Sequence, residues 1–191
     1  MTTQIILASG SPRRSELLDQ IKVRHSVYPV DIDETPRPDE VPLDYVLRMA
    51  AEKSLACVER LGLHMPVLAA DTTVVLGSRI IGKPADCEDA LAILKQLSGK
   101  THRVYSAVSL RGKQHNLAVS QTEVTFKYLT EQQIIAYWLS GEPVDKAGSY
   151  AIQGIGGVFV ESINGSFSGV VGLPLFETAE LLSKEGIEVF K

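Results

Sequence analysis

Residues 5–18 place hydroxyl side chains and two arginines where a buried strand passes into a helix. The apolar run IILA leads into Ser9-Gly10-Ser11, which Pro12 and the pair Arg13-Arg14 follow. Ser11 is expected to cap the helix through its hydroxyl, and Pro12 suits the first helical position, so free backbone N–H groups face the turn. Cations are disfavoured at a helix N-terminus unless an anion offsets them. The pattern predicts a phosphate site, with solvated surface arginines as the simpler alternative.

Asp71 is a carboxylate inside an apolar strand, in the run VLAADTTVVL of residues 67–76. Such a carboxylate is costly unless it is paired, hydrogen-bonded, metal-bound or placed at a cleft. A buried aspartate satisfied by Thr72, Thr73 or backbone N–H groups is the alternative. Glu34 lies in an acidic loop, where most acids are simply solvated. Asp71 is therefore the stronger candidate for chemistry.

Two lysines accompany these acids. Lys53 lies beside the apolar stripe of a helix predicted over 43–61, and Lys83 follows a hairpin within a Gly-Lys-Pro sequence. Each could be a surface lysine whose stem covers apolar neighbours. Together with Arg13 and Arg14 they give four cations and two acids, which suits a phosphate chain held by Lys and Arg and a divalent metal on carboxylate oxygens. Spacing alone does not show that these residues converge.

Other catalytic patterns are absent from the 191 residues. The histidines have no HxxxH or HExxH spacing, which disfavours catalytic zinc, and there is no GxSxG, GxxxxGK[ST] or GxGxxG sequence. Cys57 and Cys87 lie on separate predicted helices without a CxxC, so buried free thiols and a reducing cytoplasm are expected. A net charge of −4 argues against broad nucleic-acid binding, and no run is long enough for a signal peptide or a membrane span.

The apolar periodicity predicts the elements that must position these residues. They are a helix over roughly 15–21, a strand leading into an acidic loop over 27–42, a helix over 43–61 with Leu43 on its apolar stripe, a hairpin over 67–81, a helix over 86–97, a second hairpin over 102–128, a helix over 130–139 with a Thr130–Gln133 capping box, a glycine-rich stretch over 148–172 and a final helix after Pro174. With no repeat or linker, residues 1–191 are expected to form one α/β domain, a mixed twisted sheet with flanking helices and two lobes around a cleft.

Eight short motifs lie in order along nearly the whole chain. They are Ser9-Gly10-Ser11-Pro12-Arg13-Arg14, Asp33-Glu34, Glu52-Lys53, Ala70-Asp71-Thr72, Gly82-Lys83-Pro84, Asp145-Lys146-Ala147-Gly148, Ile152-Gln153-Gly154 and Val171-Gly172-Leu173-Pro174. Together they resemble the Maf family of nucleotide pyrophosphatases. The resemblance implies a fold like that of the inosine triphosphate pyrophosphatases, a homodimer, a divalent cation, and hydrolysis of a nucleoside triphosphate to the monophosphate and pyrophosphate.

The resemblance also implies a substrate. Arg13, Thr72 and Gln153 match the branch of the family that acts on dTTP and UTP, whereas the branch acting on 7-methyl-GTP has Trp, Gln and Glu at those positions. A glutamine offers both a donor and an acceptor to the uracil or thymine edge. The expected role is the clearance of non-standard or excess pyrimidine nucleotides.

Roles follow from the same resemblance. Asp71 is implied as the proton acceptor for the attacking water and, with Glu34, as a ligand of Mg²⁺ or Mn²⁺. The cations are implied to hold phosphate oxygens and to stabilise the leaving pyrophosphate; they are Arg13, Arg14, Lys53 and Lys83. Ser9 and Ser11 are implied to hold the phosphate chain at the helix N-terminus.

Three other functions fit parts of the pattern. A nucleotide-binding regulator of cell division or morphology would use the same site without turnover. A nucleic-acid-binding protein is disfavoured by the charge and by the lack of a basic face with interleaved aromatic residues. The same hydrolysis could extend to CTP or to modified pyrimidine triphosphates.

Overall fold

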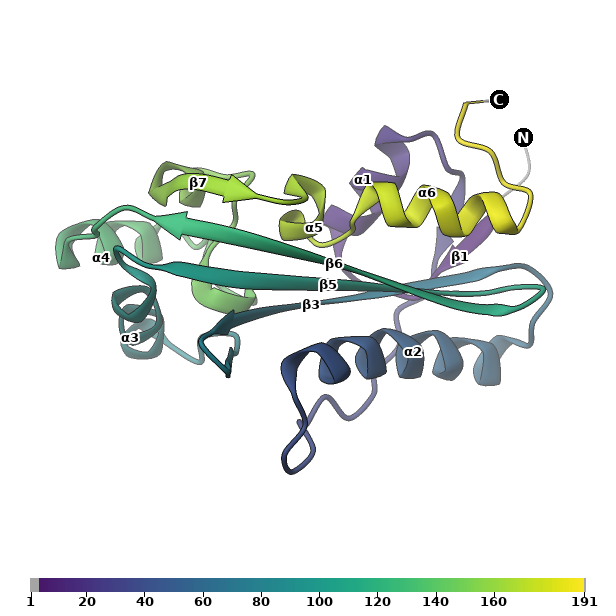
Figure 1. The fold of residues 1–191 in the computed structure, drawn as a ribbon, viewed down its shortest axis with the longest axis horizontal. Helices are drawn as coiled ribbons and strands as arrows, with labels where there is room; N and C mark the ends of the chain where they lie inside the picture. Colours follow the sequence, from purple (N-terminus) through teal and green to yellow (C-terminus); the bar gives the residue numbers. More distant parts are fainter. Residues whose placement is uncertain (1–3, 191) are drawn as a thin grey trace.

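The computed structural model describes residues 4–190, whose centre is a mixed seven-stranded sheet (Figure 1). Its strands are β1 (Ile5–Leu7), β2 (His25–Val27), β3 (Val67–Leu76), β4 (Arg79–Ile81), β5 (Thr101–Arg111), β6 (His115–Phe126) and β7 (Val160–Asn164). The order is β2-β1-β3-β5-β6-β7, and β4 pairs with the end of β3. The β2–β1 and β1–β3 pairs are parallel and the other pairs are antiparallel, so the predicted mixed sheet is confirmed.

Helices flank this sheet as predicted. They are α1 (Pro12–Gln20), α2 (Pro42–Leu61), α3 (Cys87–Leu97), α4 (Glu131–Leu139), α5 (Phe167–Val171) and α6 (Leu175–Lys184), with 3₁₀ turns η1 (Ala147–Ser149) and η2 (Ile155–Phe159). Helix α2 covers one face, α1, α5 and α6 lie on the other, and α3 and α4 pack at one end of the long strands (Figure 1). Within residues 4–190, no helix has the length and apolar character needed to cross a bilayer.

Four local expectations were wrong. Helix α1 begins at Pro12, so the range 15–21 was too short, and the Ser11 side chain makes no capping hydrogen bond. The Ser11 N–H donates to Ser9 Oγ at 3.2 Å. Leu43 is exposed and Cys87 is only half-buried. Both lie in the first turn of their helices, at the edge of the packed part of the molecule.

Alternation along β3 assigns its residues to two apolar layers. Leu68 and Ala70 belong to the large core on the side of α1, α5 and α6, whereas Val67 and Ala69 pack with Cys57 of α2. Asp71 continues the second series and Thr72 the first. Their two side chains therefore point to opposite faces of the sheet.

One edge of β3 is interrupted. On the edge opposite β5, β1 pairs with Val67 and Leu68 and β4 pairs with residues 74–76. Among the described strands, none pairs with residues 69–73 on that edge. Side chains from both faces of the sheet can reach a common space through this gap.

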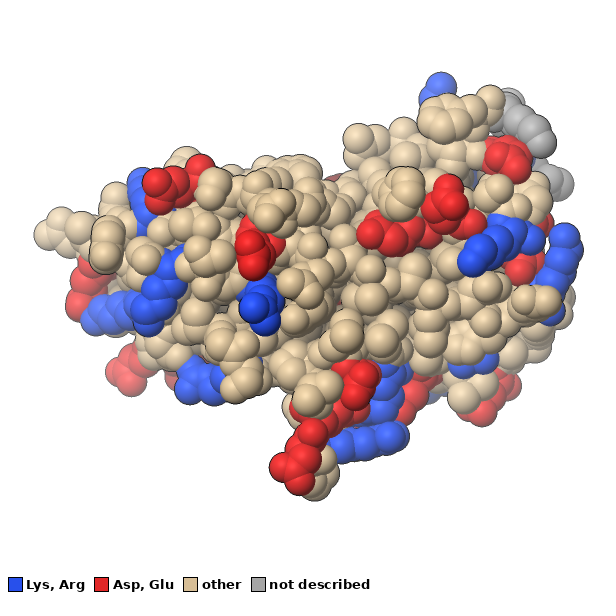
Figure 2. All heavy atoms as spheres, in the orientation of Figure 1, with Lys and Arg blue, Asp and Glu red and all other residues tan. Residues whose placement is uncertain are grey.

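The molecular surface carries mixed charge on the face drawn in Figure 2. Lysine and arginine side chains are interspersed there with aspartate and glutamate. The predicted concentration of cations is thus not a feature of the face drawn in Figure 2.

His102 of β5 gives the fold a pH-dependent stability. It is buried, with Nε2 2.9 Å from the Tyr150 hydroxyl and its ring edge-on to Phe126, and burial lowers its pKa from 6.5 to about 4. The unfolded chain takes up a proton below pH 6.5 while native His102 stays neutral, so stability present above pH 6.5 is lost as the pH falls toward 4.

We expect the free energy of unfolding to fall by about 2 kcal/mol from this group between about pH 7 and pH 5, measured by urea denaturation. The variant His102→Gln should lose most of that difference. An equal fall in the wild type and the variant would show that other groups cause it.

Candidate active site

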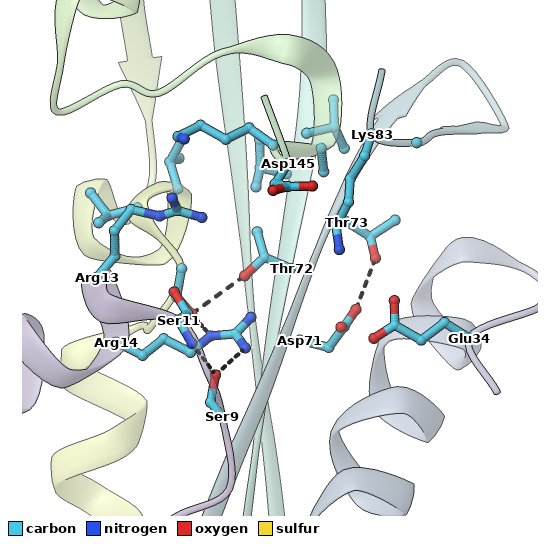
Figure 3. Close-up of a pocket in the computed structure, with 18 of the residues that line it drawn as sticks. Ser9, Ser11, Arg13, Arg14, Glu34, Asp71, Thr72, Thr73, Lys83 and Asp145 are labelled. Atoms are coloured by element: carbon cyan, nitrogen blue, oxygen red, sulfur yellow. Dashed lines mark hydrogen bonds between the residues drawn. The ribbon is translucent and has the colours of Figure 1, made fainter. Parts of the chain in front are cut away.

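The gap in β3 opens into a cavity of about 690 Å³. All the residues singled out from the sequence line it: Ser9, Ser11, Arg13, Arg14, Glu34, Lys53, Asp71, Thr72, Lys83 and Gln153. Figure 3 shows the serines and arginines on one side of β3 and Glu34 and Lys83 on the other, with Asp71 and Thr72 between them. The structure thus brings together residues that lie far apart in the sequence, around a cleft as predicted.

Asp71 and Glu34 share one lysine on the α2 side of the sheet. Lys53 Nζ lies 2.7 Å from Asp71 Oδ1 and 2.6 Å from Glu34 Oε1. Lys53 is only 8% exposed, because α2 packs directly on β3. Two carboxylates against one ammonium group leave this part of the cavity with a net negative charge.

Two neighbours hold these acids: Thr73, which the sequence already offered as a partner of Asp71, and Tyr45, which was missed. Thr73 donates to Asp71 Oδ2 at 3.2 Å, and the Tyr45 hydroxyl donates to the Glu34 backbone oxygen at 2.9 Å. Burial, with the charges of Asp71 and Glu34, raises the pKa of Tyr45 to about 12, so Tyr45 remains a neutral donor. Residues two apart share a face of a strand, which explains the contact of Thr73 with Asp71. Tyr45 could not be found from the sequence, because its partner lies in a loop.

Arg14 is fixed on the opposite side by two acceptors. Its Nη1 donates to Ser9 Oγ at 3.0 Å and its Nε donates to the Gly172 oxygen at 2.9 Å. Thr72 Oγ1 lies 2.9 Å from Ser106 Oγ and 3.4 Å from the same Gly172 oxygen. Burial lowers the pKa of Arg14, against the opposite effect of Asp71. Because a guanidinium has five N–H groups, Arg14 keeps donors for an anion in the cavity.

Further charge lies where the 143–149 turn meets the cavity. Lys146 lines it, and burial followed by the charge of Arg13 lowers the pKa of Lys146. Asp145 also lines it, with a left-handed backbone at φ 61°. Both belong to one of the eight motifs, but no role was assigned to them from the sequence. Like charges on Arg13 and Lys146 favour an anion between the walls that carry them.

The two carboxylates fit a divalent cation. Both contact the same Lys53 nitrogen, so they converge on one point. Mg²⁺ is commonly held by one or two carboxylates together with substrate phosphates and water. Within the described part of the chain, no cluster of three or more His, Cys, Asp or Glu side chains could hold a metal by itself. The remaining ligands would therefore come from a phosphorylated substrate and water.

Comparison with known proteins identifies the family. A family model described as Maf-like protein matches residues 4–185. The chain belongs to the Maf family. A dTTP/UTP pyrophosphatase of Pasteurella multocida is 49% identical to this Maf chain over 196 residues, covering 98% of each. A dTTP/UTP pyrophosphatase of Nitrosomonas europaea is 52% identical over 199 residues, covering 97% of the Maf chain and 96% of that relative. The resemblance drawn from the eight motifs is confirmed.

Solved structures resemble the Maf chain in fold. A HAM1 protein from Coxiella burnetii superposes with a TM-score of 0.51 at 16% sequence identity, covering 96% of this chain and 100% of that one. At this identity the likeness concerns the fold alone. It confirms the predicted inosine triphosphate pyrophosphatase-like architecture.

Proposed function

We propose that this Maf protein is a nucleoside triphosphate pyrophosphatase that hydrolyses dTTP and UTP to the monophosphate and pyrophosphate. The observation that carries the proposal is one cavity that holds Asp71 and Glu34 together with Arg13, Arg14, Lys53 and Lys83. Relatives named dTTP/UTP pyrophosphatase, at 49% and 52% identity over nearly the full length, support the same reaction.

Asp71 accepts the proton of the attacking water in the proposed reaction. Lys53 occupies one position on Oδ1 and Thr73 one on Oδ2, so the carboxylate plane is fixed while each oxygen keeps a free lone pair. Asp71 and Glu34 would hold a magnesium or manganese ion, which supplies Lewis acidity at the phosphate and acidifies water.

The cations take up the charge that moves onto the leaving pyrophosphate. Arg14 is held in place by Ser9 and Gly172, so little reorganisation is needed when the charge develops. Arg13 and Lys83 approach from opposite walls, as Figure 3 shows. Ser9, Ser11 and the first N–H groups of α1 hold the phosphate chain where the helix dipole favours an anion.

Gln153 contacts the base in this proposal. Its side chain is exposed within the cavity, where the amide can offer a donor and an acceptor to the edge of uracil or thymine. Thr72 and Arg13 complete the specificity set carried over from the family. One pocket accepts both dTTP and UTP, because a single methyl group changes binding only modestly.

The cellular setting is part of the proposal. Cys57 and Cys87 are free thiols, which suits the reducing cytoplasm in which nucleoside triphosphates are found. We also propose a homodimer, no nucleic-acid partner, and a role in clearing non-standard or excess pyrimidine nucleotides.

The test is pyrophosphate release from dTTP, UTP, CTP, dATP, GTP and 7-methyl-GTP with Mg²⁺, with Mn²⁺ and with a chelator. We expect metal-dependent release mainly from dTTP and UTP, and loss of release when the chelator removes the cation. Preference for 7-methyl-GTP would contradict the specificity assigned to Arg13, Thr72 and Gln153. Nucleotide binding without release from any substrate would indicate a regulator instead of an enzyme.

A further inference from the structure

Residues 151–156 carry Gln153 into the cavity and wrap around two side chains that lie behind them. Tyr137, in α4, accepts a hydrogen bond from the Ala151 N–H at 3.0 Å and donates its hydroxyl proton to Glu142 Oε1 at 2.7 Å. Glu142 follows α4 by three residues. Neither side chain lines the cavity.

Glu142 holds the other side of the same stretch. Its Oε2 accepts from the Ile155 N–H at 2.9 Å and its Oε1 from the Gly156 N–H at 2.8 Å. Partial burial raises the pKa of Glu142, but hydrogen bonds from Gly156, Tyr137 and Ile155 outweigh it, so the pKa lies below its usual value and the side chain is a charged acceptor. The backbone is thus tied down both before and after Gln153.

The glycines of this stretch are explained by the same two side chains. A Cβ added at Gly154 would overlap the Glu142 carboxylate, and one added at Gly156 would come within 2.5 Å of the Tyr137 hydroxyl. Only glycine lets the backbone approach this closely. The segment is therefore fitted to Tyr137 and Glu142, in addition to being bonded to them.

The ends of the segment are anchored differently from its middle. Tyr150 packs edge-on against Phe126 at 4.8 Å, and Phe159 packs edge-on against the Tyr137 ring at 4.9 Å. In between, the other backbone hydrogen bonds seen in the described residues are local, from Gly154 to Ala151 and from Gly157 to Gly154. Apart from the buried side chain of its neighbour Ile152, the direction of Gln153 thus depends on the Tyr137 hydroxyl and the Glu142 carboxylate.

We propose that Tyr137 and Glu142 are positioning residues that set the direction of the Gln153 amide and thereby the affinity for the pyrimidine base. This inference rests on the proposed function, in which Gln153 contacts the base. Both residues act through the backbone of 151–156, because neither faces the ligand itself.

The variants Glu142→Gln and Tyr137→Phe test this role. Two donors point at Oε1 and one at Oε2 of Glu142, so a glutamine, with a single oxygen, turns its NH₂ toward at least one of them. We expect the KM for UTP to rise about tenfold with kcat changed less than about twofold, and the inhibition constant of inorganic tripolyphosphate to stay unchanged. The control Glu131→Gln lies on α4, as Tyr137 does, and loses only a surface ion pair with Lys95 of α3; it should match the wild type.

A double-mutant cycle separates positioning from general loosening. If Glu142 acts through Gln153, adding Glu142→Gln to Gln153→Ala should raise the KM for UTP little further. Additive effects, or a weakened tripolyphosphate inhibition constant, would overturn the positioning role, as would an unchanged KM in both single variants of an active enzyme. Absence of pyrophosphate release from UTP by the wild type would instead overturn the proposed function itself.

Discussion

Replacing Asp71 with asparagine is expected to slow pyrophosphate release from UTP by about 10³-fold, because an amide cannot accept a proton from water near neutral pH. The shape of the site should survive the change. The asparagine oxygen can keep the contact that Lys53 makes at 2.7 Å, and its NH₂ can donate to the Thr73 hydroxyl. The loss should therefore appear in kcat, measured in single-turnover experiments, and not in the unfolding transition.

The matched control is Asp31→Asn. Asp31 is an exposed acid in the loop that carries Glu34, and it does not line the cavity. That variant should turn over UTP at the wild-type rate, whereas Asp71→Asn should still bind UTP in a competition assay. Wild-type turnover by Asp71→Asn would remove Asp71 from the proton-accepting role.

Local signals in the sequence predicted the helix ends well where the capping hydrogen bonds join residues close together in the chain. Thr130 and Gln133 form the predicted capping box, and Asp86 accepts the Asp89 N–H at the start of α3. The buried strand around Asp71 was equally clear, because its apolar run is bounded by turn residues. Ser11 does precede the helix, but its side chain makes no capping hydrogen bond.

The candidate site was harder to predict, because its main feature, the unpaired edge of β3, depends on how the strands pair. The unpaired edge at residues 69–73 exists because β1 ends at Leu7, opposite Leu68, and β4 ends at Ile81, opposite Val74, a geometry that no local pattern encodes. The individual residues were found from their motifs. Their shared contacts, such as the bridge of Lys53 between Glu34 and Asp71, needed the fold.

The supporting residues were missed for the same reason. Glu142 reads as an ordinary surface acid after a helix, and Tyr137 reads as core. Both readings are compatible with their local sequence, and Tyr137 is indeed buried. Only the return of residues 151–156 past α4 shows that these side chains hold the loop carrying Gln153.

Replacing Lys53 with methionine is expected to lower both activity and stability. Without its ammonium group, Glu34 and Asp71 face each other uncompensated, and removing one partner of a largely buried ion pair costs about 3 kcal/mol in the free energy of unfolding. Turnover of UTP should fall by about 10²-fold as a charge near the phosphate chain is lost. In a chelator-containing buffer, urea denaturation should show the full loss of stability.

Added Mg²⁺ or Mn²⁺ should then restore much of the stability of Lys53→Met, and stabilise it more than the wild type, because the freed carboxylates bind the cation without competition from Nζ. The control Lys95→Met removes an exposed ion pair with Glu131 and should shift stability by less than about 0.5 kcal/mol, with or without metal. Equal stability of Lys53→Met in chelator and in metal would show that Glu34 and Asp71 do not hold the cation, whatever the activity of that variant.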